Sequence, residues 1–291
     1  MKNFLLIICT LFLFAFPAYS SDSTDCKGKE PEFAYTCFVR ENLSEEATQL
    51  NLFLAKYLKA MEDHNTNELN ELYADTYLNG DKLNKNTMIE LIQQSWNLLS
   101  NMQYSNEIQN IRFDKNFATI EIDENITGIT KTKSEITNDN GQIKSSARIV
   151  YYLQKFGKGW KIISDKTLYE ETSIKYGKAK DLNINIYAPE HVLKNIDYSI
   201  SLETEIPEDT FALGSITNET LTYPHKKAQE VFRQVPSELN LLERVVKANN
   251  DSLNELAIAS LSFCTVKKGE VTVPEIDVTG TAVLLKRVNI E

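Results

Sequence analysis

Five side chains in this sequence could act as acid–base groups: His64, Asp75, Glu121, Asp123 and Asp165. A carboxylate enclosed by apolar walls has a raised pKa, because burial disfavours its charged form, and it can then shuttle a proton. Each candidate also has a plainer explanation. His64 closes a helix, Asp75 faces solvent, and Glu121 and Asp123 alternate with isoleucines as the polar face of a strand. The sequence therefore leaves every catalytic role unassigned.

Aromatic side chains accompany these groups and could line a ligand pocket. Tyrosine and tryptophan combine an apolar body with a polar tip, which suits the wet mouth of a cavity. We expect a ligand-binding set made of Tyr57, Tyr73, Tyr77, Trp96, Tyr151, Trp160 and Asp165. The alternative is that the aromatic members pack in the core, which is the commoner role of such residues.

Other kinds of site have little support. His64, His191 and His225 lack the spacing of metal ligands, and the sequence has no glycine-rich phosphate loop or nucleophile elbow. We therefore expect neither a metal nor an organic cofactor. The formal net charge of −10 argues against nucleic acid as a partner, because such a field repels phosphate.

The first 20 residues have the pattern of a secretory signal peptide. Lys2 precedes an apolar run over residues 4–16, Pro17 breaks that run, and the segment ending at Ser20 has small residues where signal peptidase reads. The run is shorter than the roughly 20 residues that a membrane-spanning helix needs. We expect cleavage near Ser20 and an extracytoplasmic protein, periplasmic or secreted, with no stable membrane span.

Three cysteines remain after the expected cleavage. An oxidising compartment would let Cys26 and Cys37 close a short disulfide loop, which would stabilise the fold by about 2–3 kcal/mol. The alternative is that all these thiols stay free. Cys264 lies in an apolar run and is expected to be a small buried hydrophobic residue rather than a nucleophile.

The expected secondary structure changes type along the chain. After a polar tether over residues 21–43, apolar residues at spacings of three and four predict a helix that starts at Ser44. Further helices are expected at residues 66–79 and 86–102. Tight turns are expected at residues 114–116 and 157–159. From about residue 108 the apolar period becomes two, which predicts antiparallel strands. Helices followed by such strands are typical of an α+β architecture.

A long hairpin ends in the segment FGKGWKIISD, residues 156–165. Together with the helix over residues 45–63 and the short helices after it, this hairpin resembles the NTF2-like, or SnoaL-like, superfamily over about residues 45–176. The resemblance implies that residues 45–178 form a cone of curved antiparallel sheet wrapped around helices, with a pocket at its open end. It also implies a homodimer through the sheet face. That superfamily includes enzymes and non-catalytic proteins, so the resemblance does not decide the activity.

Residues 181–291 are short β-prone pieces separated by proline and glycine. Their spacing predicts a β-rich C-terminal domain, for which an immunoglobulin-like sandwich is the candidate architecture. Residues 239–249 fit a helix or a strand.

We expect an exported, non-catalytic protein whose NTF2-like domain binds a small apolar ligand or a protein partner. The first alternative is an acid–base enzyme of the isomerase, dehydratase or hydrolase kind, which predicts a deep pocket with a buried carboxylate or histidine. The second is an envelope-assembly or structural protein that presents a strand edge of its C-terminal part to a partner.

Overall fold

The computed structural model describes the backbone of residues 31–157, 159–223, 229–267 and 275–291. Side chains are described from residue 45 onward, apart from residues 267 and 275 beside the last gap. The predicted signal peptide, Cys26 and the side chain of Cys37 lie outside this description, so the signal peptide and the disulfide remain predictions.

Helices precede strands in the described chain. The α-helices are α1 (Pro31–Glu62), α2 (Thr66–Leu72) and α3 (Lys85–Leu98). The strands of the first half are β1 (Leu99–Asp114), β2 (Phe117–Lys133), β3 (Asn140–Phe156) and β4 (Gly159–Gly177), followed by a 3-10 turn at Lys178–Asp181. Those of the second half are β5 (Ile184–Tyr187), β6 (His191–Val192), β7 (Asp197–Thr204), β8 (Phe211–Thr220), β9 (Arg233–Gln234), β10 (Leu241–Lys247), β11 (Glu255–Lys267) and β12 (Glu275–Ile290).

The first helix begins earlier than the sequence pattern indicated. α1 starts at Pro31, so Ser44 lies inside the helix and residues 31–43 are not the predicted tether. Proline is favoured at the first helical position, where its missing N–H is not needed. No glycine or proline interrupts residues 32–43, so nothing in that stretch stops the helix.

The second helix ends earlier than predicted. α2 stops at Leu72, and Tyr73 has extended backbone with φ −90° and ψ 138°. Tyr73 forms a parallel bridge to Ile162 of β4, and the N–H of Ala74 donates to the Ile162 carbonyl at 2.9 Å. A hydrogen bond to a distant strand therefore replaces the next helical one, and tertiary contact overrides the local pattern.

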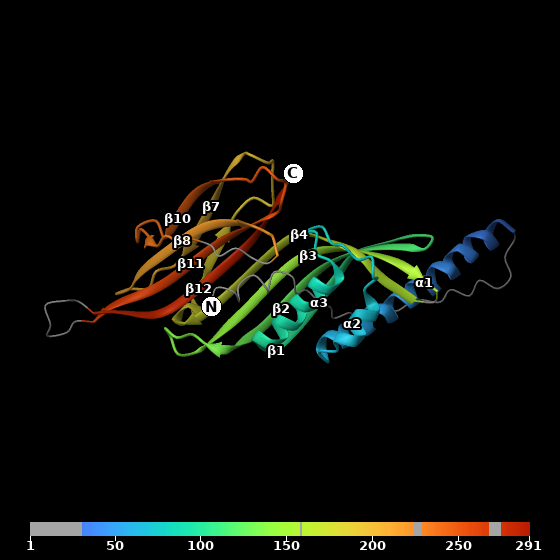
Figure 1. The fold of residues 1–291 in the computed structure, drawn as a ribbon, viewed down its shortest axis with the longest axis horizontal. Helices are drawn as coiled ribbons and strands as arrows, with labels where there is room; N and C mark the ends of the chain where they lie inside the picture. Colours follow the sequence, from blue (N-terminus) through green and yellow to red (C-terminus); the bar gives the residue numbers. More distant parts are fainter. Residues whose placement is uncertain (1–30, 158, 224–228, 268–274) are drawn as a thin grey trace.

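β1 to β4 form a consecutive antiparallel meander. β1 begins at Leu99, which pairs with Thr130, so the third helix ends before residue 102. Both predicted turns are confirmed, because Lys115 and Gly157 have positive φ values of 53° and 61° between consecutive strands. One face of the meander packs against the helices around an apolar core, which gives the cone at one end of the molecule (Figure 1).

β12 joins the second half of the chain to this meander. It pairs antiparallel with β4 from Lys286↔Glu171 to Gly280↔Gly177. In the described residues the sheet therefore runs in the order β1-β2-β3-β4-β12-β11-β8-β9, with β6 paired to β12. The final strand of the chain extends the sheet that the first half began (Figure 1).

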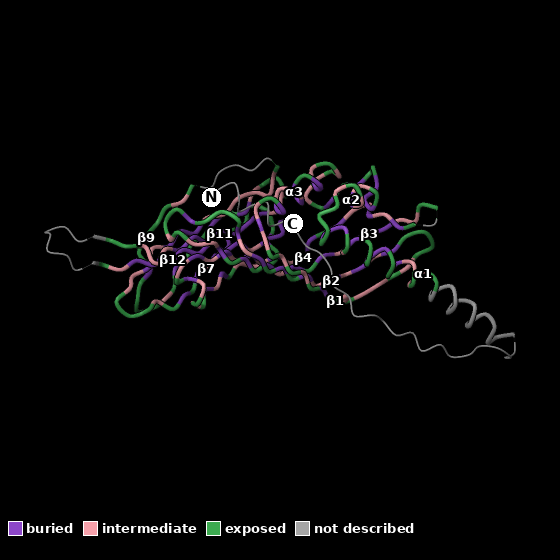
Figure 2. Tube along the Cα trace, turned by 90° about the horizontal axis from the view of Figure 1, so that it is seen from below, coloured by how far each residue is buried: buried purple, intermediate pink, exposed green. Residues whose placement is uncertain are grey.

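Two different layers cover opposite faces of this sheet. Side chains alternate along a strand, so Ala282, Leu284 and Val288 of β12 pack in the core of the three-stranded sheet β10-β7-β5. Leu285 and Arg287 point to the other face, where the helices cover the first half. Figure 2 shows α2 and α3 on one side of the sheet and β7 on the other.

Residues 181–291 are rich in strands, and residues 241–247 are strand rather than helix. The larger of their two layers is continuous with the cone's sheet, and an immunoglobulin-like architecture is not confirmed. The predicted boundary between residues 178 and 181 falls on the 3-10 turn, yet strand pairing crosses it.

A buried ion pair ties the α2–α3 loop to β12. Arg287 donates from Nη2 to Oδ1 of Asp81 at 2.6 Å and from Nη1 to Oδ2 at 2.9 Å. Asn254, next to β11, donates to the same carboxylate at 2.7 Å. Burial opposes the charge of Asp81, but the guanidinium of Arg287 holds the pKa of that carboxyl below its usual value. The pair joins the two halves of the chain.

Arg287→Met should destabilise the protein by about 3–5 kcal/mol, because it leaves Asp81 buried without its cation. Arg148→Met is the matched control, since Arg148 pairs with Asp123 on an exposed surface, where such pairs contribute at most about 1 kcal/mol. Urea denaturation followed by circular dichroism measures both free energies of unfolding. Equal losses in the two variants would contradict the role given to the buried pair.

Candidate functional site

Five of the seven predicted ligand-binding residues meet inside the cone. They come from α1, from the segment after α2, and from β3 and β4: Tyr57, Tyr73, Tyr77, Tyr151 and Asp165. All are buried, and even Asp165 is only 7 % exposed. Tyr151 and Asp165 are direct neighbours in the β3–β4 register. The fold thus brings together residues that are up to 108 positions apart in the sequence.

Hydrogen bonds and ring contacts connect these side chains. The hydroxyls of Tyr57 and Tyr73 lie 2.8 Å apart, and the hydroxyl of Tyr77 donates to Oδ2 of Asp165. The rings of Tyr73 and Tyr77 meet edge to face with centroids 4.8 Å apart. The tyrosines therefore satisfy one another and Asp165 in a place that water does not reach.

Sequence reasoning missed one member of this group, Glu124. It is fully buried, and Tyr151 donates to its Oε1 at 3.2 Å, while Oε2 has no hydrogen-bond partner among the described residues. The signal was present in the alternation of β2, because Ile122 and Ile126 share its face. Glu121 and Asp123, which the sequence offered instead, fall on the other face. We call these six residues (Tyr57, Tyr73, Tyr77, Glu124, Tyr151 and Asp165) the tyrosine–carboxylate cluster.

Burial changes the acidity of the whole cluster. It raises the pKa of Asp165 to about 6, although the hydrogen bond from Tyr77 partly opposes the change. It raises the pKa of Glu124 well above the usual value, with the charge of Asp165 adding to the effect. Desolvation likewise raises the pKa of all four tyrosines. Burial in the core therefore favours the uncharged form of Glu124.

The remaining candidates lie elsewhere. Trp96 stacks on His64, which closes α1, with ring centroids 4.7 Å apart, and Trp160 packs near Phe113 at 6.2 Å. Asp75 is exposed and pairs with Lys85 at 2.8 Å, as its plainer explanation predicted. The structure does not bring these side chains to the cluster.

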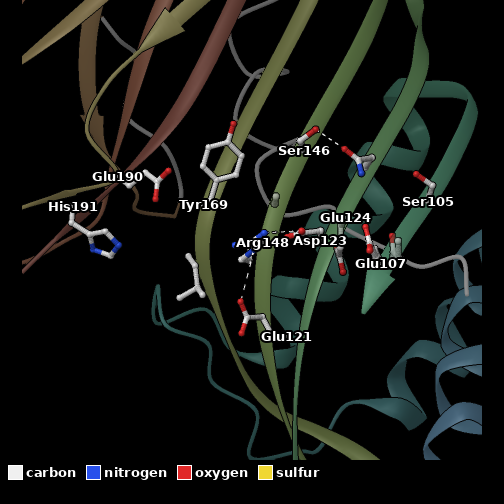
Figure 3. A pocket seen from close by; sticks show the side chains of 14 residues that line it. Ser105, Glu107, Glu121, Asp123, Glu124, Ser146, Arg148, Tyr169, Glu190 and His191 are labelled. Atoms are coloured by element: carbon white, nitrogen blue, oxygen red, sulfur yellow. Dashed lines mark hydrogen bonds and ion pairs between the residues drawn. The ribbon is translucent and has the colours of Figure 1, made fainter. Parts of the chain in front are cut away.

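The described pocket lies mainly on the other face of the sheet, and its lining also includes Glu124 of the tyrosine–carboxylate cluster. It has a volume of about 820 Å³ and is bounded by β1 to β4, by His191 of β6 and by Glu190, which precedes β6. Figure 3 shows Arg148, Asp123 and Glu121 in its middle, with Glu190 and His191 beyond Tyr169. It forms because the sheet continues past the edge of the β10-β7-β5 layer. None of the seven predicted ligand-binding residues lines it.

The pocket is polar and mainly acidic. Glu107, Glu121, Asp123 and Glu190 supply carboxylates along its wall. Arg148 is already engaged, because its Nε donates to Oδ1 of Asp123 at 2.6 Å and its Nη2 donates to Oδ2 at 2.8 Å. This chemistry differs from the apolar pocket that the sequence led us to expect.

Two further findings concern metals and membranes. Among the described residues, no group of three or more histidine, cysteine, aspartate or glutamate side chains is placed to hold a metal ion. No helix in that part of the chain is both long and apolar enough to cross a membrane.

Cys264 is buried with a free thiol, as its apolar surroundings predicted.

Comparison with known proteins gives similarity over part of the chain. No protein-family model matches the sequence, and no curated protein matches it. Solved structures do match part of this chain, and each match covers most of the matched structure's own chain.

One matching structure is a conserved protein from Planctomyces limnophilus, with 12% identity, 42% of this chain and 94% of that chain covered, and a TM-score of 0.37. Another is a ketosteroid isomerase-like protein from Erwinia carotovora atroseptica, with 17% identity, 42% and 95% covered, and a TM-score of 0.33. A third is an NTF2-like superfamily protein from Salmonella enterica Typhimurium, with 12% identity, 43% and 91% covered, and a TM-score of 0.34. NTF2-like proteins are thus similar to part of this chain, as the sequence predicted, and at these values the similarity supports no statement about activity or ligand.

Glu124→Gln should stabilise the protein increasingly as pH rises from 5 to 8. The folded-state pKa of Glu124 is raised, so the stability that the protonated carboxyl contributes is present at low pH and is lost as pH rises towards that pKa. Glutamine keeps the shape and has no proton to lose, so the difference between variant and wild type should grow by at most about 1.4 kcal/mol per pH unit.

Urea denaturation at a series of pH values measures this difference. Glu121→Gln, on the other face of the same strand, is the control, and the slope for Glu124→Gln should exceed the slope that this control gives. A flat difference for Glu124→Gln would show that Glu124 is not an uncharged acid in the folded protein.

Proposed function

We propose that this chain is an exported binding protein that holds a positively charged group of its ligand in the outer pocket. The observation that carries the proposal is the excess of carboxylates there: Glu107, Glu121, Asp123 and Glu190 line the pocket against one arginine that Asp123 already binds. Carboxylates in a concave surface attract cations. The pattern of the first 20 residues supports export.

The proposed ligand carries primary amine or guanidinium groups. Arg148 neutralises Asp123, and His191 faces Glu291 at 3.0 Å, so neither offers an uncommitted charge to an anion. Glu107 and Glu190 are exposed and lie on opposite sides of the pocket in Figure 3, where they can contact two amines of one ligand. A small apolar ligand would leave these carboxylates without partners and pay for their desolvation.

Acid–base catalysis at Asp165 is the second candidate, and one observation favours it. Asp165 is a buried carboxyl with a pKa of about 6 that accepts a hydrogen bond from Tyr77, which suits proton transfer near neutral pH. Asp165 does not line the described pocket, so a substrate would reach it only after the chain around it moves. Binding therefore has the stronger support.

Isothermal titration calorimetry with spermidine tests the proposed ligand class, with the dianion glutarate as the opposite probe. Spermidine should bind and glutarate should not, and spermidine affinity should fall as salt is added, because salt screens exposed charges. The double variant Glu107→Gln/Glu190→Gln should weaken spermidine binding by roughly tenfold, since it removes two attractive charges from the pocket wall.

The matched control is Glu208→Gln/Glu238→Gln, which removes the same charge from exposed positions outside the pocket. It should leave spermidine affinity within about twofold of wild type, because screened charges at a distance contribute little. Equal binding of both probes, or spermidine binding that survives the pocket substitutions, would refute a cation site.

A further inference from the structure

A short strap lies against the tyrosine–carboxylate cluster, on the helix side of the sheet. We define the strap as the α2–α3 loop Leu78–Asn84. Its internal hydrogen bonds make it compact, because the side-chain oxygen of Asn79 accepts from the N–H groups of Asp81 and Leu83 at 3.0 and 2.8 Å. Gly80 lies against β4, because an added Cβ would be in ordinary van der Waals contact, at 3.5 Å, with the carbonyl oxygen of Asp165.

Hydrogen bonds hold the strap to two parts of the molecule. On β4, the N–H of Gly80 donates to the Asp165 carbonyl at 2.8 Å, and the hydroxyl of Ser164 donates to the Leu78 carbonyl at 2.7 Å. On the second half of the chain, Arg287 of β12 holds Asp81 through two hydrogen bonds. Asp165 and Arg287 therefore anchor the same short segment from two sides.

Charges of both signs face the Asp165 carboxyl. Asp81 raises its pKa and Arg287 lowers it, while hydrogen bonds from Tyr77 and Asn79 also lower it. Glu170, which is also buried on β4, lies 3.9 Å from the guanidinium of Arg287. The titratable and charged groups around Asp165, taken element by element, are Tyr57 of α1, Tyr73 and Tyr77 after α2, Asp81 of the strap, Glu124 of β2, Tyr151 of β3, Glu170 of β4 and Arg287 of β12.

The geometry points to a pH-controlled latch, in which the strap stays closed while Asp165 is uncharged and opens more often once Asp165 ionises. An ionised Asp165 is a second buried anion close to Asp81, and the two compete for Arg287. Opening the strap frees the N–H of Gly80 from β4 and lets water reach the Asp165 carboxylate, which removes its desolvation penalty. The cost of opening therefore falls when the proton leaves.

The sign and size of the effect follow from the two protonation equilibria. In the closed state the pKa of Asp165 is about 6, and the ordinary value is 3.8, so protonation favours closure and that stability is lost as pH rises through about 6. If the open state has the ordinary value, the opening equilibrium should be about tenfold larger at pH 7.5 than at pH 5.0.

Amide hydrogen exchange of Gly80 and Leu83, measured by NMR and corrected for the intrinsic exchange rate, tests this latch on the full chain. Protection of both amides should fall by about tenfold between pH 5.0 and 7.5 in wild type. In Asp165→Asn the fall should disappear. Asp75→Asn removes an exposed carboxyl from the same connecting segment and should keep the wild-type response.

Tyr77→Phe provides a second variant that leaves the charge of Asp165 in place. The substitution removes the Tyr77 hydroxyl and with it a hydrogen bond that lowers the pKa of Asp165. The midpoint of the exchange response should therefore move to higher pH. Equal protection at both pH values in wild type, an unchanged response in Asp165→Asn, or an unmoved midpoint in Tyr77→Phe would each overturn the latch.

Discussion

The antiparallel pairing of β12 with β4 is the constraint on which the rest of the structure depends. It joins strands that are more than a hundred residues apart, so the cone's sheet and the second half share one set of backbone hydrogen bonds. Strand pairing fixes which face each side chain takes. In β12 that choice sends Leu284 into the second layer and Arg287 towards the helices, where it meets Asp81.

The same register explains why polar groups are buried at the centre of the cone. Asp165 lies beside Tyr151 across β3 and β4, and Glu124 occupies a position whose strand neighbours Ile122 and Ile126 belong to the apolar core. Buried carboxyls are tolerated when they are protonated or hydrogen-bonded. The tyrosines supply hydroxyl donors for both carboxyls, and burial raises the pKa of Glu124, which favours its uncharged form. The interior is therefore a polar network enclosed by apolar side chains.

Offset layers produce the outer pocket. The helices cover the first half of the sheet on one face, and the β10-β7-β5 layer covers the second half on the other. Where that layer ends, the uncovered face of β1 to β4 carries Glu121, Asp123 and Arg148, and Glu190 closes one side. A polar concavity at the junction of two layers is thus a consequence of the topology rather than of any local motif.

The sequence by itself determined the order of helices and strands and the turns at Lys115 and Gly157, because these depend on neighbours within a few residues. It could not end α2 at Leu72, since the competing hydrogen bond comes from Ile162 of β4. It could not separate Glu124 from Glu121, because only the register of the sheet decides which face is buried. Tertiary structure alone decided that β12 completes the cone's sheet and that Arg287 meets Asp81, since long-range pairing energy leaves no trace in local sequence.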